Sequence, residues 1–185
     1  MDYTLIAIVA VIAVIVLWGI STYNSLIGGR NSVEEAFSGM DVFLKQRYDL
    51  IPNLVETVKG YCAHEKDTLT AVIEARAKAV SGGTIDEKLA ADQNLSGALS
   101  RLFALSEAYP DLKANTNFID LQNQLKDIEG QIATSRTSYN RVVVNYNNKV
   151  SKVPSNIIAG LFKFERATLF EIVNPVEREN VKVQF

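Results

Sequence analysis

Residues that commonly catalyse reactions or bind transition metals are scarce in this sequence. Its 185 residues include one cysteine, Cys62, and one histidine, His64. A lone cysteine cannot form an internal disulfide, and a lone histidine cannot supply the two Glu-x-x-His pairs of a di-iron helical bundle. The stretch HEKDT at His64 also lacks the second histidine of the zinc protease motif. We therefore expect neither a metal site nor a cofactor.

Motifs of nucleotide-binding and hydrolytic enzymes are missing as well. The chain contains no P-loop, no Gly-x-Gly-x-x-Gly and no Gly-x-Ser-x-Gly. Cys62 and His64 are two residues apart, on different sides of a helix, so neither readily activates the other. The carboxylates Asp41, Asp49 and Glu56 are interpreted as a helix cap and surface charges. We predict a protein that is not an enzyme, with a carboxylate-based enzyme as the open alternative.

The chain also lacks a strong excess of charge. Its formal net charge is −2 and 48% of its residues are hydrophobic. This composition indicates neither a disordered chain nor a protein that binds nucleic acid through bulk positive charge.

A long apolar run stands at the N-terminus. Tyr3 to Ile20 contains no charged residue, and at about 1.5 Å per residue such a helix spans roughly 27 Å, enough for a bilayer core. The alternative is a cleaved signal peptide, but no Lys or Arg precedes the run and no Ala-x-Ala site follows it. We predict an uncleaved transmembrane anchor over residues 1–22 that contacts the lipid bilayer through residues 3–20.

The distribution of positive charge predicts how this anchor is oriented. No Lys or Arg precedes the span, whereas Arg30, Lys45 and Arg47 follow it, which favours a cytoplasmic C-terminal domain at the cell membrane. A pilin-like filament subunit is an alternative. It would need a basic leader and a glutamate within the apolar run, where Ala7 and Ile8 stand instead.

Helical periodicity follows a connection over residues 23–30 that contains Gly28 and Gly29. One apolar stripe consists of Val33, Phe37, Met40, Leu44 and Ile51, and a second of Leu54, Val55, Val58, Cys62, Leu69, Val72, Ile73 and Val80, ending at Ser81-Gly82-Gly83. Thr84 and Glu87 have the spacing of a capping box, and a third helix contains Leu89, Leu95, Leu99, Leu102 and Phe103.

A fourth helix begins after Tyr109-Pro110-Asp111 and ends before Pro154. Its apolar residues alternate steps of three and four like a coiled-coil seam, interrupted by Ser135: Phe118, Leu121, Leu125, Ile128, Ile132, Tyr139, Val142 and Tyr146. The sequence therefore predicts an all-α fold, in which the transmembrane helix is followed by an up-and-down four-helix bundle over residues 31–153.

Pro52 lies between the first and the second apolar stripe. Leu44, Ile51 and Val58 are seven residues apart, so the stripe keeps its phase and a kinked helix is possible. A proline inside a helix costs about 3 kcal/mol, but almost nothing in a first turn. Because Asp49 could cap such a new helix, we favour a turn at Pro52.

Two Tyr-Asn pairs follow the seam of the fourth helix. Tyr139 and Tyr146 are predicted to be core residues, with hydroxyls that reach a bundle end or a buried partner. Asn140 and Asn147 are expected to hydrogen-bond the neighbouring helix. Packing and helix register are the expected role of these pairs, and a partner site is the alternative.

Residues 154–185 form a C-terminal amphipathic segment and tail. Ile157, Ile158, Leu161, Phe162 and Phe164 lie among the basic residues Arg141, Lys149, Lys152, Lys163 and Arg166. We expect these apolar residues to close one end of the bundle, with contact between residues 155–173 and an anionic leaflet as the alternative. Val181 to Phe185 alternates like a short strand. Pairing with Ile172-Val173, or with a neighbouring subunit, would satisfy the backbone hydrogen-bonding groups of this strand, and a frayed terminus is the alternative. We predict a homo-oligomer larger than a dimer, partly held by this tail.

Long stretches of this chain resemble the LemA family of bacterial membrane proteins. They are YNSLIGGRNSVEEAFSGMDVFLKQRYDLIPNLVETVKGY from Tyr23 to Tyr61, HE at His64, EARAKA around Arg76, YPDLKANTNFIDLQNQLKDIEGQIATSR from Tyr109 to Arg136, and the YN pairs. Phe37, often Trp in the family, and Gly39, usually polar, depart from it. The resemblance implies an N-terminal anchor and a four-helix up-and-down bundle, supports a turn at Pro52, and implies no established activity.

The sequence and this resemblance together predict a non-catalytic scaffold or interaction protein of the bacterial cell envelope. A membrane-surface binding or remodelling protein that acts through the basic apolar C-terminal segment is the alternative. Protein partners at the membrane are expected and nucleic acid is not. The candidate structural or interaction residues are Asp49, Pro52, Asn53, Tyr139, Asn140, Tyr146 and Asn147.

Overall fold

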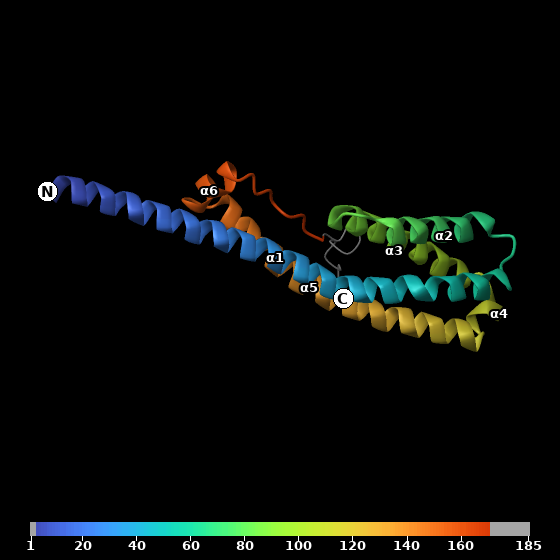
Figure 1. Ribbon diagram of the computed structural model, residues 1–185. Coiled ribbons are helices and arrows are strands. Elements are labelled where there is room, and N and C mark those ends of the chain that lie inside the picture. The colour runs from blue at the N-terminus through green and yellow to red at the C-terminus, as the bar shows by residue number, and fades with distance from the viewer. Residues whose placement is uncertain (1–2, 171–185) are drawn as a thin grey trace, which may run out of the picture. The chain divides into compact units, whose positions relative to one another are not determined.

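The computed structural model describes residues 3–170, which form six helices and no strand (Figure 1). The helices are α1 (Tyr3–Lys59), α2 (Lys66–Ser81), α3 (Ile85–Ser106), α4 (Pro110–Lys113), α5 (Thr116–Ser151) and α6 (Ser155–Leu161). The prediction of an all-helical chain is confirmed for this part of the protein. The predicted strand at Val181 to Phe185, and the Ile172-Val173 segment that could pair with it, lie outside the described residues.

The chain divides into two compact units, to both of which α1 and α5 contribute. Unit 1 comprises Met1–Ser38 and Thr137–Leu169, and unit 2 comprises Gly39–Arg136 and Phe170–Phe185.

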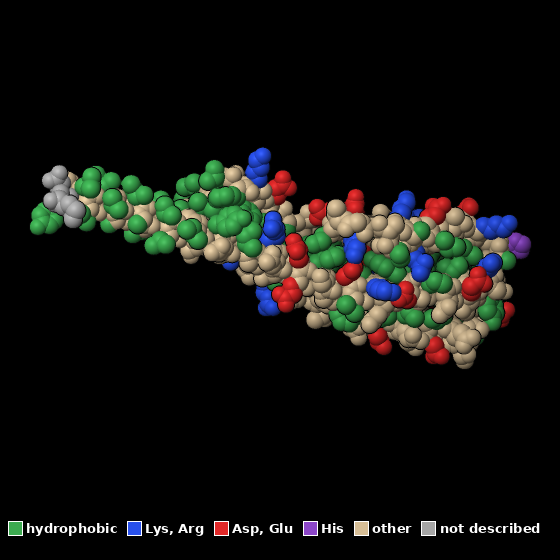
Figure 2. Space-filling model, viewed as in Figure 1, with side chains coloured by type: hydrophobic (Ala, Val, Ile, Leu, Met, Phe, Trp, Pro, Cys, Tyr) green, Lys and Arg blue, Asp and Glu red, His purple; other side chains and the backbone are tan. Residues whose placement is uncertain are grey.

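The first part of α1, in unit 1, is an uncovered apolar helix. Its most apolar stretch has a mean hydropathy of 2.8, and none of that stretch is buried. In length and composition α1 is the one helix of the described chain that could cross a membrane, as the hydrophobic side chains along it in Figure 2 illustrate. An exposed apolar surface of this length is stable in lipid and not in water, which is consistent with a membrane protein.

The connection expected at residues 23–30 is helical and belongs to α1. Gly29 serves a close approach there, because a Cβ atom at this position would come within 3.0 Å of Cδ2 of Tyr146 in α5. Glycine therefore allows α5 to pack closely against α1 in unit 1.

The predicted apolar stripes are largely buried. Every residue of the first predicted stripe is buried, with Val33 and Phe37 in unit 1 and the others in unit 2. Within unit 2, α2 and α3 lie side by side (Figure 1). The second stripe is only partly confirmed, because Ile73 and Val80 are more than half exposed. The helical periodicity of α1 does not continue into α2. The buried face of α2 is therefore not the predicted stripe but the face formed by Leu69, Val72, Ala75 and Ala79.

The turn predicted at Pro52 is wrong. Helix α1 continues through Pro52 to Lys59, and the chain turns between Gly60 and Glu65 instead. Proline has no amide hydrogen, so the carbonyl of Tyr48, four residues earlier, loses its helical donor. Nε of Arg76, on α2, donates to that carbonyl oxygen at 2.7 Å. This bond offsets part of the cost of an interior proline whose ring faces solvent.

The cap predicted at Asp49 is also wrong. No helix begins behind it, and Oδ2 of Asp49 instead accepts from Nζ of Lys45 at 3.0 Å on the exposed surface. Asn53 is exposed on α1, where its carbonyl accepts from the Thr57 hydroxyl.

Most of the remaining helix boundaries follow the sequence signals, but the fourth predicted helix begins at Thr116, after the separate short helix α4. Helix α2 ends at Ser81, and Pro110 is the first residue of α4. Thr84 and Glu87 form the predicted capping box, in which Oγ1 of Thr84 accepts from the Glu87 amide at 3.2 Å and Oε2 of Glu87 accepts from the Thr84 amide at 2.9 Å. The Thr84 and Gly83 amides lower the pKa of the Glu87 carboxyl, because they stabilise its charged form.

The long fourth helix is α5. Its seam is confirmed as a core face, because Ile128, Ser135 and Val142 are half-buried and the other seam residues are buried: Phe118, Leu121, Leu125, Ile132, Tyr139 and Tyr146.

Candidate functional site

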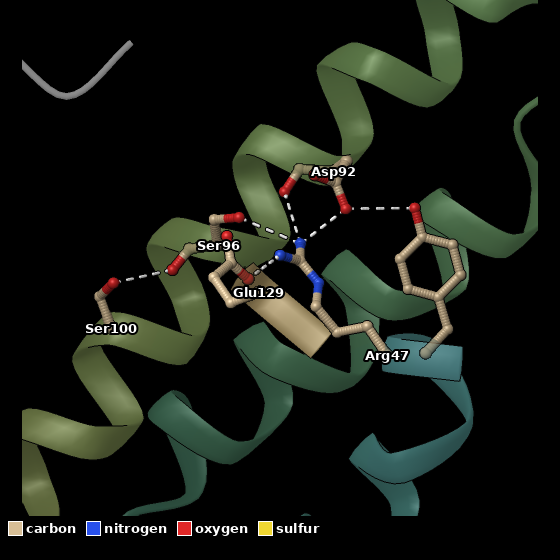
Figure 3. Close-up of polar contacts among 6 residues, drawn as sticks. Arg47, Asp92, Ser96, Ser100 and Glu129 are labelled. Atoms are coloured by element: carbon tan, nitrogen blue, oxygen red, sulfur yellow. Dashed lines mark hydrogen bonds and ion pairs between the residues drawn. The ribbon is translucent and has the colours of Figure 1, made fainter. Parts of the chain in front are cut away.

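A buried guanidinium holds three helical segments of unit 2 together. Arg47 of α1 is only 1% exposed. Its Nη2 donates to Oδ1 of Asp92 on α3 at 2.6 Å and to Oγ of Ser96 at 3.0 Å, while Nη1 donates to Oε2 of Glu129 on α5 at 2.7 Å (Figure 3). We call Arg47, Tyr48, Asp92, Ser96 and Glu129 the Arg47 network.

Helix periodicity explains why these charged residues meet. Arg47 lies three residues after Leu44 and four before Ile51, within the buried stripe of α1. Asp92 is equally in phase with the buried Leu89 and Leu95 of α3. This network was not predicted from the sequence, in which Arg47 is interpreted only as a charge that follows the membrane span. Opposite charges at apolar stripe positions were the signal that could have revealed it.

Burial shifts the pKa of two members of the network, Asp92 and Tyr48. Removal from water raises the pKa of the Asp92 carboxyl above its ordinary value, although Arg47 opposes this shift. Burial and the neighbouring Asp92 raise the pKa of the Tyr48 hydroxyl, which donates to Oδ1 of Asp92 at 3.2 Å. The Arg47 Nε atom is buried without a hydrogen-bond partner among the described residues. The charged ends are thus engaged with one another, an arrangement suited to fixing helix positions.

The three carboxylates considered as an acid–base group do not converge. Asp41 binds Nζ of Lys88 at 2.8 Å, Asp49 binds Lys45, and Glu56 lies 3.5 Å from Nζ of Lys59. Each carboxylate thus has a lysine partner of its own. Within residues 3–170 no group of three His, Cys, Asp or Glu side chains is placed to hold a metal ion.

The Tyr-Asn pairs lie in unit 1, where they bind an extended segment that follows α6. The hydroxyls of Tyr139 and Tyr146 donate to the carbonyl oxygens of Thr168 and Glu165, each at 2.9 Å. Asn147 makes two bonds to one residue: its Nδ2 donates to the Ala167 carbonyl and its Oδ1 accepts from the Ala167 amide, both at 2.8 Å. We call these three α5 side chains the Asn147 clamp.

The clamp confirms one expectation for these pairs and corrects another. Tyr139 and Tyr146 are buried core residues whose hydroxyls reach backbone partners. The expectation that Asn147 bonds a neighbouring helix is wrong, because the Asn147 amide bonds extended backbone. The extended segment needs these bonds because it has no ladder of its own. Asn140, the other asparagine of these pairs, is half-buried. Burial of Tyr146 raises the pKa of its hydroxyl.

Helix α6 does not close a bundle end with all its apolar residues, as was expected. Ile157, Leu161 and Phe162 are more than half exposed, whereas Ile158 and Phe164 are half-buried. The expectation is therefore wrong for the exposed three. The residues that are covered pack on unit 1's part of α1.

Comparisons with known proteins agree with the resemblance noted from the sequence. The model of the LemA family matches residues 36–185. The chain is 25% identical to magnetosome protein MamQ 2 of Paramagnetospirillum magneticum over 197 residues, which cover 92% of this chain and 71% of that protein.

Two further relatives have similar levels of identity. Protein LemA of Metamycoplasma hominis is 24% identical over 163 residues, covering 85% of this chain and 72% of that protein. Magnetosome protein MamQ of Magnetospirillum gryphiswaldense is 24% identical over 174 residues, covering 80% of this chain and 64% of that protein. None of these names is the name of an enzyme.

Proposed function

The chain belongs to the LemA family, and from this premise we propose that it is a membrane-anchored helical scaffold or interaction protein of the bacterial cell envelope. The observation that carries the proposal is the composition of α1. One unbroken helix begins with an uncovered apolar stretch and continues to Arg47, whose side chain is locked into the core of unit 2. A helix of this kind suits an anchor joined directly to an interaction module.

We further propose that unit 2 is an up-and-down four-helix bundle formed by its parts of α1 and α5 together with α2 and α3. Three contacts support this arrangement. Arg47 joins α1 to α3 and α5, Arg76 joins α2 to α1, and α2 lies beside α3. Short connections between consecutive helices favour antiparallel neighbours.

The chemistry of the described side chains supports a role without catalysis. The buried Arg47 pairs with the buried Asp92 and with the more exposed Glu129, and Asp41, Asp49 and Glu56 each pair with a lysine. Catalytic acids and bases are usually held in a cleft with displaced pKa values and free access to substrate. Asp92 has the displaced pKa but lies within the core.

The proposed location is the cell membrane, crossed once, with the helical domain in the cytoplasm. Arg30, Lys45 and Arg47 follow the span and support this orientation. The relatives include magnetosome proteins and a protein named LemA. We propose a membrane role shared by these relatives, and no nucleic-acid partner.

We propose that the first partner of the protein is another copy of itself. Confinement to a membrane plane raises the local concentration of identical chains, and an alternating tail such as Val181 to Phe185 can add to a neighbour's backbone. The expected assembly is a homo-oligomer larger than a dimer that also binds other envelope proteins.

A second candidate function is supported by α6. Its exposed apolar face and flanking lysines favour contact with a membrane surface through residues 155–173. In that function the protein would bind or remodel the membrane surface through this segment.

Capture from native membranes tests the scaffold function. Full-length protein, crosslinked in the membrane and then purified, is expected to bring down further copies of itself and a reproducible set of envelope proteins. The matched control carries an unrelated apolar span in place of residues 3–20, so that partners of the helical domain are distinguished from bystanders in the bilayer. Recovery of uncrosslinked single chains alone would contradict the proposal.

A further inference from the structure

Helix α6 lies against the end of the apolar stretch of α1, and both belong to unit 1. A Cβ atom built on Gly19 would lie 3.8 Å from Cδ1 of Ile158. One turn further along α1, the ring of Tyr23 packs edge-on against Phe162 with centroids 4.7 Å apart. These contacts fix α6 at the level of Gly19 to Tyr23.

The segments on either side of α6 contact α1 further from the apolar stretch. Before α6, Nζ of Lys149 donates to Oγ of Ser25 at 3.1 Å. After α6, the Arg30 guanidinium lies 5.8 Å from the centroid of the Phe164 ring. Because a helix rises about 1.5 Å per residue, Ser25 lies roughly 9 Å beyond Gly19. The chain therefore approaches the apolar stretch, forms α6 and turns back.

The depth of α6 follows from the position of Gly19 in the apolar run. This step rests on the proposed anchoring of α1 in the membrane. Gly19 is the second-last residue of the apolar stretch Tyr3 to Ile20, after which polar residues begin, and Trp18 and Tyr23 flank it with rings that favour the membrane interface. The contact between Gly19 and Ile158 thus places α6 at the boundary between acyl chains and headgroups.

The face of α6 directed away from α1 is apolar. Ile157 and Leu161, four residues apart on α6, are 62% and 72% exposed, and Val153, in the turn before this helix, is 79% exposed. Phe162 extends this surface and is 54% exposed, whereas Ala159 is buried. Figure 2 shows hydrophobic side chains gathered over α6 and the neighbouring stretch of α1. A continuous apolar surface at this depth matches the hydrocarbon edge of a leaflet.

Exposed charges flank this face, and one of them occupies an unfavourable backbone position. Lys152, Lys163 and Arg166 are exposed, as is the acidic Glu165. Helix α6 ends in a Schellman motif, in which the Lys163 amide donates to the Gly160 carbonyl and the Phe164 amide to the Ala159 carbonyl. Lys163 has φ 55° there, a conformation that costs a non-glycine residue about 1–2 kcal/mol. A lysine at this glycine position supplies a cation beside the apolar face.

We propose that α6 is an interfacial foot that enters the same leaflet from which α1 emerges. Val153, Ile157, Leu161 and Phe162 insert about 5–10 Å into the boundary between headgroups and acyl chains, and Lys152 and Lys163 lie at the level of the lipid phosphates. The occupant of this surface is lipid. Two points of membrane contact, the α1 span and the α6 foot, hold unit 1 at the bilayer.

Depth-dependent quenching in a bilayer tests the foot. Full-length variants Ile157→Cys and Leu161→Cys carry an environment-sensitive fluorophore and are reconstituted in nanodiscs of phosphatidylcholine and phosphatidylglycerol. Wild-type protein, whose only thiol is the buried Cys62, measures background labelling. Val11→Cys, within the span, is the lipid-exposed control, and Val144→Cys, an exposed apolar position on α5, is the water-exposed control.

The foot predicts that labels at positions 157 and 161 emit at shorter wavelength than the label at 144. Lipids that carry a quencher near the headgroup should quench most of the fluorescence of these two labels, whereas iodide in the water should quench little of it. Iodide quenching equal to that at position 144 would overturn the foot, and protection from both quenchers would indicate a second protein on this face and overturn it as well. In either case, quenching of the label at position 11 by lipids would still support the proposed anchor. If lipids do not quench this label, both the anchor and the foot are contradicted.

Discussion

Arg47 illustrates how a single residue can specify the arrangement of several helices. Removing the Arg47 guanidinium and the Asp92 carboxylate from water costs several kcal/mol, and their mutual attraction only partly offsets this cost. The Arg47 network is therefore better suited to selecting one helix register than to adding stability. Asp92 also depends on Arg47, because without it an ionised carboxylate would remain buried with only neutral partners.

Substitution of Arg47 is expected to be far more damaging than its charge alone suggests. Arg47→Met should lower the free energy of unfolding by about 3–5 kcal/mol, because the buried Asp92 loses its counter-charge. Denaturant unfolding of full-length protein in mild detergent measures the loss. Lys45→Met, which breaks only the exposed pair with Asp49, should cost less than about 1 kcal/mol. Equal losses in the two variants would show that the network is not a structural lock.

Pro52 and Arg76 should be coupled through the Tyr48 carbonyl. Arg76→Ala is expected to cost about 2 kcal/mol in the wild-type chain, because the carbonyl that lacks its helical donor then loses its charged donor as well. In a chain that already carries Pro52→Ala, residue 52 supplies an amide to that carbonyl and the same substitution should cost less. A double-mutant cycle on unfolding free energies measures the difference. Additive effects would mean that Arg76 does not compensate for the proline.

At the scale of elements, local signals predicted the helices and failed where a distant residue decides. A few neighbouring residues are enough to specify three features that the structure confirms: the Thr84 capping box, the end of α2 at Ser81 and the seam of α5. The prediction of a turn at Pro52 was wrong because an interior proline is tolerated here through Arg76. This residue lies on another helix, 28 positions from Tyr48. No local pattern contains that information.

The two candidate sites differ in how far the sequence could predict them. Arg47 and Asp92 interrupt apolar stripes and could have been noticed as charges at core positions. The partner of Asn147 could not, because the segment around Ala167 has no periodicity and is held by side chains of α5. Tyr139 and Tyr146 were predicted as core residues from their seven-residue spacing, but their acceptors were not.

The Asn147 clamp should control the order of the extended segment. Asn147→Ala removes both bonds to Ala167, and we expect it to destabilise that segment locally by about 2 kcal/mol. Hydrogen exchange at the Ala167 amide, measured on full-length protein in nanodiscs, should accelerate markedly while exchange within α3 is unchanged. Asn148→Ala, at the exposed neighbouring asparagine, is the matched control. Unchanged exchange at Ala167 would mean that other contacts hold the segment.

The function proposed for the whole molecule depends on which side of the membrane the helical domain occupies. Ser81→Cys places a thiol at the exposed end of α2. We expect an impermeant maleimide to label it only after cells are permeabilised, because the positive residues follow the span. Wild-type protein is the background control, since Cys62 is buried and burial raises the pKa of its thiol. Labelling in intact cells would reverse the orientation.

The anchored chain is proposed to function by assembling, first with copies of itself. The mass of full-length protein in mild detergent, measured by light scattering with the detergent contribution subtracted, reports this assembly. A chain ending at Asn180 serves as the comparison, because it lacks the alternating tail from Val181 to Phe185. We expect a full-length assembly larger than a dimer and a smaller mass for the shortened chain. Equal masses would show that the tail is not part of the interface, and a monomeric mass for both would show that the chain does not assemble with itself.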